Sequence, residues 1–416
     1  MATELDQRLS APKHPVPPPK RPVRWSKENL FGSWFDTLLT LVFGVVIVWA
    51  LVSLVQFLLD ADATIIRRNL TNFVVGRFPR DELWRPWVAT YLITALIGLA
   101  TGGSIAAARE RATEAGLPFV EPTLRDVVRR FWPLLLLTAV ILAFTQTLLP
   151  TLLTVGAIVV FALIRSLGLR LPSGVRRWNW LIGIVLLVGS YMALAAFGGQ
   201  GWEDWGGIHL NVFLTVAGIL FAFPIGLLLA IGRRSKLPAV RWLSVTFVEF
   251  VRGVPLITLL LMGAFALGFI LPADLRPGFI TRMLIAITLF EAAYIAEVVR
   301  GGLQSVPQGQ VEAGQALGMS PWRITRRIVL PQALRNTIPA MVGQFISLWK
   351  DTTLVSVLGL PDLLEVSRTV NSQPDFLGQG LFIITLGFAG LVFWVVSYTM
   401  SREARRLEKK LGVGER

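Results

Sequence analysis

The sequence has 416 residues, of which 54% are hydrophobic, and its mean hydropathy is +0.62. This composition excludes an ordinary soluble protein and indicates an integral membrane protein. Its formal net charge of +14 would suggest nucleic acid as the partner of a soluble chain, but here Lys and Arg fall mostly between apolar segments, as membrane orientation requires. The absence of cysteine excludes disulfides and thiolate metal sites, and the two histidines do not form a useful metal-binding pair.

The amino-terminal part begins with a polar segment, residues 1–30, in which prolines lie among lysines and arginines. This composition predicts a disordered cytoplasmic tail. The first apolar segment, residues 34–58, is too long and too far from the start for a cleaved signal peptide, so we expect a transmembrane helix. Residues 60–85 then mix acids with five arginines, which violates the positive-inside bias if the segment is external, although the neighbouring loops favour that side.

Four more spans are expected in the amino-terminal half. Residues 86–108 form the second span. The apolar residues 133–164 approach twice the ~20 residues that one span needs, and Pro150 divides them, so we expect two spans joined by a tight external turn. One long tilted helix is the alternative. The fifth span, residues 180–197, precedes a Gly- and Trp-rich segment without basic residues, 198–207, which indicates an external interfacial loop.

That loop is also the expected domain boundary. We divide the chain into the tail 1–30, an extension of about five transmembrane helices at 31–207, a core at 208–401 and a basic cytoplasmic tail at 402–416. Five further spans are expected in the core: 211–231, 255–271, 279–299, 338–358 and 381–400. Arg-rich segments beside these spans place both termini in the cytoplasm. Between the first two, residues 240–250 combine aromatic with charged side chains, which favours a position along the membrane interface.

A long polar loop, residues 297–331, separates the third and fourth core spans. Ser305 and Gln308 have the spacing of a capping box, and Pro307 suits the first turn of a helix, where its missing N–H costs nothing. One face of this helix is expected to be nearly flat and able to approach a partner closely, since small residues surround a single acid. These residues are Ala313, Gly314 and Ala316, around Glu312.

Two further signals divide the loop into two helices. Gly318 is a natural left-handed terminator, and Ser320 with Pro321 opens a second helix that carries several arginines. This charge places the loop in the cytoplasm, facing lipid head groups or acidic protein. A solvated connection without further function is the alternative.

The loop resembles the "EAA" loop of permease subunits of bacterial ATP-binding-cassette importers. The matching residues are Glu312, Ala313 and Gly314, then Gly318, Ile328, Leu330 and Pro331. Other segments resemble the polar amino-acid branch of that family: 252–256, 293–302, 306–310, 330–333 and 350–354. The resemblance covers residues 209–401. It departs from the family where Gly314 replaces the usual Ala and Thr353 a frequent Ser. Glu291-Ala292-Ala293 has the same letters but lies within an apolar span, so it is not the loop.

The resemblance implies a type I importer permease for polar L-amino acids in the bacterial inner membrane, similar to the larger permease of general L-amino-acid or glutamate/glutamine/aspartate/asparagine uptake systems. It implies that Glu312, Ala313, Gly314 and Gly318 form a coupling helix that inserts into a cytoplasmic ATPase dimer. The other implied partners are a second permease subunit, either a different chain or an identical copy, and a periplasmic amino-acid-binding protein. Membrane lipid surrounds the chain, and no nucleic acid is implied.

The motifs of an enzyme are absent. The sequence has neither a G-x-x-x-x-G-K-[ST] phosphate loop nor a G-x-S-x-G elbow, so we expect a non-catalytic subunit without a cofactor of its own. ATP and Mg would then be bound by the partner ATPase. A secondary amino-acid transporter is the alternative, because ten spans in two fives suggest inverted repeats. The first five spans, however, lack counterparts of the loop 297–331 and of Lys350-Asp351.

Ionisable residues within spans are costly unless they are paired or line a pathway. A zwitterionic amino acid needs compensating charges and hydrogen-bond partners along its route. The candidates for the substrate pathway are Glu291, Gln344, Ser347, Lys350 and Thr352. The alternative is that Lys350 pairs with Glu291 or with Asp351 and only fixes helix packing.

Overall fold

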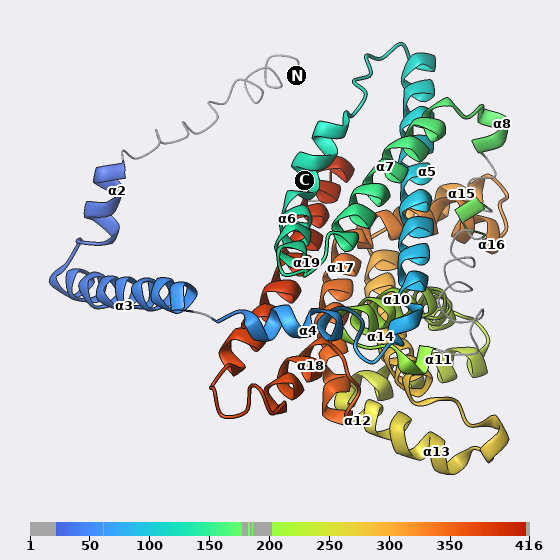
Figure 1. Cartoon of the computed structure of the whole chain (residues 1–416). Helices are drawn as coiled ribbons and strands as arrows, with labels where there is room; N and C mark the ends of the chain where they lie inside the picture. Colours follow the sequence, from blue (N-terminus) through green and yellow to red (C-terminus); the bar gives the residue numbers. More distant parts are fainter. Residues whose placement is uncertain (1–21, 61, 177–181, 184, 186–201, 413–416) are drawn as a thin grey trace. The chain divides into compact units, whose positions relative to one another are not determined.

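The computed structural model describes residues 22–60, 62–176, 182–183, 185 and 202–412. The named elements of this part of the chain are all helices, which confirms the predicted all-α class (Figure 1). Contacts between residues divide the chain into two compact units, Met1–Asp62 and Ala63–Arg416.

The first unit contains α2 (Pro22–Asn29) and α3 (Trp34–Asp60). Of the predicted tail, residues 1–21 lie outside the described residues, whereas Pro22–Asn29 is helical rather than irregular. Before α3, the Ser33 hydroxyl accepts a hydrogen bond from the backbone N–H of Asp36 at 3.1 Å, as an N-cap does. The long helix confirms the first predicted span. Its window Trp34–Ser53 is long and apolar enough to cross a membrane.

The second unit begins with four longer helices and two short ones: α4 (Thr64–Val75), η1 (Arg80–Glu82), α5 (Trp84–Glu114), α6 (Leu124–Ala143), α7 (Leu149–Arg170) and α8 (Ser173–Arg176). The break predicted at Pro150 is confirmed. The proline lies in the first turn of α7, where its missing N–H costs no hydrogen bond, and α6 has already ended. One long helix is therefore excluded. Most of the span predicted at 180–197 lies outside the described residues.

Glycines allow α5 and α7 to pack closely. A Cβ atom at Gly98 of α5 would lie 2.9 Å from the carbonyl oxygen of Phe161, and one at Gly168 of α7 would lie 3.0 Å from that of Leu99. Backbones that approach this closely leave no room for a side chain. Small residues at such crossings are a common basis for helix association in membranes, where apolar side chains gain little by leaving lipid.

The remainder of the second unit runs from residue 202 to the end of α19. Its elements are η3 (Trp202–Asp204), α10 (Gly207–Gly232), α11 (Pro238–Gly253), α12 (Leu256–Leu261), η4 (Met262–Ala266), α13 (Leu267–Ile270), η5 (Ala273–Leu275), α14 (Phe279–Gln304), α15 (Gln308–Ala316), α16 (Pro321–Ile324), η6 (Thr325–Val329), α17 (Leu330–Asp351), η7 (Thr352–Leu358), α18 (Leu363–Thr369), η8 (Val370–Ser372) and α19 (Phe382–Leu411). Helices α10 and α14 pack along each other, and a Cβ atom at Gly226 of α10 would lie 2.7 Å from Ile295 Cγ2 of α14.

Three of the five predicted core spans are confirmed as the long helices α10, α14 and α19. The span predicted at 338–358 is wrong in its last turns, because the α-helix α17 ends at Asp351 and the chain continues as the 3-10 helix η7. The span predicted at 255–271 corresponds to the continuous helical segment Leu256–Ile270, in which a π-helical turn, η4, joins α12 to α13. It is bent by 105° relative to α11, next to Pro255, which has no N–H to continue the preceding helix.

Six described helices are long and apolar enough to cross a membrane, or seven if α11 and the following bent segment count as one span. These are counts by length and composition among the described residues. Helices α6 and α17 match predicted spans but are not among the six. The predicted total of ten spans therefore stays a prediction.

The amino-terminal helices of the second unit pack against the carboxy-terminal ones. Gly76, after α4, lies against Gly206, and the Gly207 N–H donates to the carbonyl of Pro361 at 2.7 Å. Helix α4 also packs on α10 and α18 (Figure 1). The division into compact units consequently falls after Asp62, and does not coincide with the domain boundary predicted at residue 207.

Candidate functional site

The polar loop between α14 and α17 is helical almost throughout. Its first helix, α15, begins at Gln308, with Pro307 as the N-cap residue rather than in the first turn. The predicted capping box is wrong, because α14 extends to Gln304 and holds Ser305 at its own end. The Ser305 hydroxyl donates to the Gly302 carbonyl at 2.9 Å and accepts from Asn336 Nδ2 at 2.9 Å.

The predicted end of α15 at Gly318 is confirmed. Gly318 has a φ angle of +70°, its N–H donates to the carbonyl of Gln315 at 2.9 Å, and the N–H of Met319 donates to that of Gly314 at 3.1 Å. These two bonds form a Schellman motif, which needs a left-handed residue and so favours glycine. The second helix starts as predicted, because Ser320 caps α16 and Pro321 takes its first position.

The small residues of α15 lie on two different faces. Gly314 is buried, and a Cβ atom there would lie 2.9 Å from Ile324 Cγ1 of α16. Its size thus serves the packing of the loop on itself, which corrects the prediction that Gly314 belongs to a flat outer face. Glu312 and Ala313 are exposed. Sequence reasoning missed two large apolar side chains beside them, Leu317 at 80% and Trp322 at 62% exposure.

A charged cluster that sequence reasoning missed lies at the base of the loop. The Glu297 carboxylate of α14 lies 3.2 Å from Arg233 Nη1 and 3.4 Å from Arg252 Nη1, and it also pairs with Arg300. Arg233, in turn, lies 2.7 Å from Glu249. The cluster joins the ends of α10, α11 and α14. The signal was present in the sequence, since two of the quoted motifs, 252–256 and 293–302, supply Arg252 and Glu297.

The candidate pathway residues on α17 divide between two environments. Ser347 and Lys350 are exposed and Gln344 is half-buried. The exposed stripe along α17 recurs every three or four residues and contains Asn336, Ala340, Gly343, Ser347 and Lys350. This spacing places them on one face of the helix. The described chain leaves this face uncovered, and it carries small and polar side chains.

Thr352 lies elsewhere, fully buried in a polar cluster. Its Oγ1 accepts from Asn211 Nδ2 at 3.0 Å and donates to the Trp349 carbonyl at 2.8 Å. The same Asn211 amide donates to Asp362 Oδ2 at 3.1 Å and accepts from the N–H of Leu363 at 3.0 Å. Thr352 therefore connects α10, η7 and α18 and does not join the exposed stripe. Asn211 and Asp362 were missed, although an Asn at the start of a span was a visible signal.

Glu291 is buried on α14, with 2% exposure, and its Oε1 has no hydrogen-bond partner among the described residues. Within the described chain, Lys350 forms no ion pair within 4.0 Å, either with Glu291 or with Asp351. The structure thus does not contain the ion pairs of the packing alternative. It also places Glu291 in the interior, whereas Ser347 and Lys350 are exposed.

Comparisons with known proteins show what the chain is similar to. The model of a family described as "Binding-protein-dependent transport system inner membrane component" matches residues 222–411. The "Inner membrane amino-acid ABC transporter permease protein YhdY" of Escherichia coli (strain K12) is 32% identical over 416 residues, which cover 95% of this chain and 94% of that protein. The "Glutamate/glutamine/aspartate/asparagine transport system permease protein BztC" of Rhodobacter capsulatus is 34% identical over 427 residues, covering 94% and 93%.

A shorter relative matches only about half of this chain. The "Probable glutamine ABC transporter permease protein GlnP" of Bacillus subtilis (strain 168) is 37% identical over 205 residues, which cover 49% of this chain but 91% of that protein. The two long relatives extend over the amino-terminal half as well, which the family model leaves unmatched.

Proposed function

The chain belongs to the binding-protein-dependent transport system inner membrane components, among the permeases of amino-acid ABC transporters, and from this premise we propose that it translocates polar L-amino acids across the bacterial inner membrane. One observation carries the proposal: similarity over nearly the whole length to a permease named for glutamate, glutamine, aspartate and asparagine. The chain itself is non-catalytic in this proposal. A cytoplasmic ATPase dimer binds and hydrolyses ATP with Mg, and a periplasmic binding protein delivers the amino acid.

The helix α15 is proposed as the coupling helix that docks into the ATPase. The Schellman motif at Gly318 and the packing of Gly314 on Ile324 make the loop a rigid helical hairpin. Its exposed Trp322 supplies an aromatic anchor of the kind that dominates binding energy at interfaces, and the exposed Leu317 adds apolar surface. The Glu297 cluster joins α14, which leads into the hairpin, to α10 and α11, so that a displacement of the loop is transmitted through α14 to these helices. The arginines of the hairpin support a cytoplasmic position.

The exposed stripe of α17 is proposed as one wall of the substrate pathway. Lys350 can meet the carboxylate of an amino acid, and Ser347 with Gln344 can exchange hydrogen bonds with it. Because this face is uncovered in the described chain, a second permease subunit is needed to close the pathway. We propose a different chain as that subunit. Glu291 is kept as a pathway candidate that would have to become accessible during transport, whereas Thr352 supports the fold.

Uptake of labelled amino acids into vesicles tests the function. The chain is co-expressed with its ATPase, second permease and binding protein, and uptake of glutamate, glutamine, aspartate and asparagine is measured with and without ATP. We expect uptake only with ATP and binding protein together. Uptake that instead follows an ion gradient in the absence of the ATPase would establish the alternative, a secondary transporter.

A further inference from the structure

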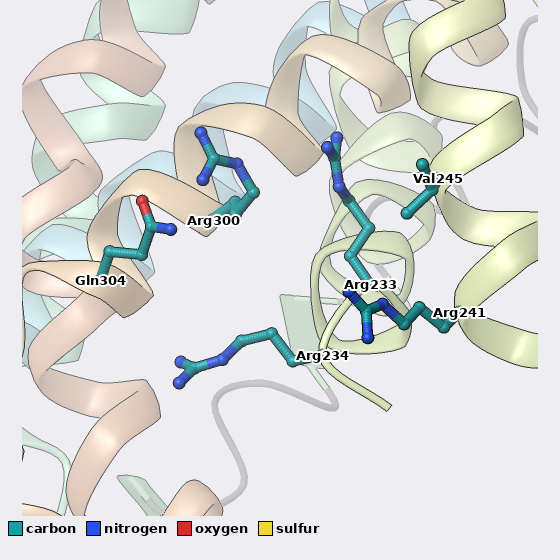
Figure 2. A pocket seen from close by; sticks show the side chains of 6 residues that line it. All are labelled: Arg233, Arg234, Arg241, Val245, Arg300 and Gln304. Atoms are coloured by element: carbon teal, nitrogen blue, oxygen red, sulfur yellow. The ribbon is translucent and has the colours of Figure 1, made fainter. Parts of the chain in front are cut away.

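A cavity lined mainly by arginines lies where α10, α11 and α14 end or begin. It has a volume of about 270 Å³, and its lining residues are Arg233, Arg234, Arg241, Val245, Arg300 and Gln304. Figure 2 shows Arg300 and Gln304 on one side, Arg233, Arg241 and Val245 on the opposite side, and Arg234 extending between them. Arg234 extends from the α10–α11 corner toward the end of α14, where its Nη1 donates to the Leu303 carbonyl at 3.4 Å.

The positive charge of this cavity exceeds what the nearby carboxylates neutralise. The charged groups are five guanidinium groups and two carboxylates: Arg233, Arg234, Arg241, Arg252 and Arg300 with Glu249 and Glu297. The carboxylates are engaged by Arg233, Arg252 and Arg300. Within the described chain, Arg234 and Arg241 form no ion pair, and the residues that line the cavity include no acid. Both are exposed, so their charges are available to an anion that binds in the cavity.

The surface beside the cavity is apolar and exposed. Helix α11 buries Ser244, Val248 and Val251 on one face. On its other side, Trp242 is 66% and Leu243 60% exposed, directly after Arg241 in the chain. An amphipathic helix with this arrangement is typical of the membrane interface, with its basic residues at the head groups and its apolar residues toward the acyl chains. A soluble anion would make no use of that apolar surface.

We propose that the four arginines that line the cavity bind the phosphate of an anionic phospholipid, whose acyl chains lie along the exposed apolar side of α11. These arginines are Arg233, Arg234, Arg241 and Arg300. Guanidinium groups present planar pairs of donors that match phosphate oxygens, and basic pockets between transmembrane helices are known to hold anionic head groups. The bound lipid would tie the end of α14 to the α10–α11 corner. Since α14 leads into the loop 297–331, the lipid would support the same helix ends as the Glu297 cluster.

Native mass spectrometry of the full chain, purified in detergent with the subunits that accompany it, tests the proposal. The probe is phosphatidylglycerol, with phosphatidylcholine as the neutral reference. The variant R234Q/R241Q removes the two arginines without an ion pair and leaves the Glu297 cluster intact. We expect it to bind phosphatidylglycerol about 25-fold more weakly, from about a fivefold effect per arginine. The matched control R326Q/R327Q removes two exposed arginines from the loop and should retain the lipid.

Each outcome decides the matter. If the double variant does not fold, R234Q and R241Q are tested singly, and each should lose about fivefold in binding. Equal binding by wild type and variant, or an equal loss in the control, would overturn the proposal. Displacement of the lipid by millimolar inorganic phosphate or glycerol 3-phosphate would identify a soluble-anion site instead. A variant that keeps its lipid but loses the ATPase on purification would identify an acidic protein as the ligand.

Discussion

Asp362 shows how burial and hydrogen bonding compete at a single residue. It is fully buried in the connection between η7 and α18, where its carboxylate caps α18 through the Glu365 N–H at 2.9 Å and accepts from Asn211. Burial raises the pKa of Asp362 from 3.8 to about 6, against these hydrogen bonds, which lower it. The protonated form is therefore the one that the folded state favours.

Stability is expected to fall with rising pH because of this residue. Below pH 4 both states hold the proton, and the contribution is complete. Between pH 4 and 6 the unfolded chain releases its proton first, so stability decreases, and above pH 6 roughly 3 kcal/mol has been lost. Melting temperatures of wild type and D362N from pH 4 to 8 measure this, and D362N should lack the decrease. The surface acid Asp375 gives the control: D375N should keep the wild-type profile. The same slope in D362N would contradict the assignment.

Lys350 is expected to act on the substrate and not on the fold. Lys350 is exposed and forms no ion pair within the described chain. The K350M substitution therefore does not remove the partner of a buried carboxylate. The melting temperature should change little, whereas uptake should fall roughly 10- to 100-fold through the loss of a charge-assisted hydrogen bond. K410M, at the end of α19, is the control for a lost surface charge. A sharp loss of stability that E291Q restores would instead show a structural pair.

Local sequence signals predicted the breaks between elements better than their extents. Pro150 and Gly318 act through their own backbone, since one lacks an N–H and the other reaches positive φ, and both breaks are confirmed. The capping box at Ser305 was wrong because α14 continues to Gln304 and Asn336, far along the chain, takes the hydroxyl. Gly314 likewise faces inward because it packs against Ile324 of the next helix. Such contacts form only after folding, and no local pattern contains them.

The turn between α15 and α16 is expected to fail when Gly318 is replaced by valine. No atom lies within 4 Å of a Cβ there, so the cost is the left-handed backbone itself, at least about 1–2 kcal/mol for a residue with a side chain. Co-purification of the ATPase and ATP-dependent uptake should both decrease. G301V is the matched control, because Gly301 lies in α14, outside the proposed docking helix, is equally open and has no positive φ. Unchanged assembly and uptake in G318V would remove the coupling role from this loop.

Across the second unit, the contacts between loops fall into two sets, each of which joins a different group of loops. In one set, Glu203 accepts from the N–H of Ile280 at 2.7 Å, and Arg68 pairs with Asp375 at 3.2 Å. In the other set, the end of α5 meets α8 through Glu110 and Arg176, and the start of α6 meets the end of α19 through Arg130 and Glu403. If the chain crosses the membrane at each predicted span, the two loops of each contact lie on the same side of the membrane. The sequence contained the charges, but only the fold shows which loops meet.

These pairs also ease the conflict in the segment 60–85, whose arginines oppose the positive-inside bias if the segment is external. Besides the bridge of Arg68, the Arg80 guanidinium donates to the Gly76 carbonyl at 2.9 Å, and buried Arg85 lies 3.2 Å from Glu82. Nearby acceptor groups thus partly compensate the charges of these arginines. The domain boundary at residue 207 stays a prediction, and the approach of Gly76 to Gly206 shows that the two predicted parts pack against each other.

Reporter fusions are expected to place the two sets of loops on opposite sides of the membrane. Fusions after Arg130, Arg177, Arg234 and Lys410 should report the cytoplasm, since each follows or precedes an Arg-rich segment. A fusion at Gly201 should report the exterior, because five spans precede it in the ten-span prediction, of which four correspond to α3, α5, α6 and α7. Insertion of a reporter at residue 374, beside Asp375, is the control and should agree with Gly201. A cytoplasmic result at Gly201 would remove the span predicted at 180–197 and leave nine.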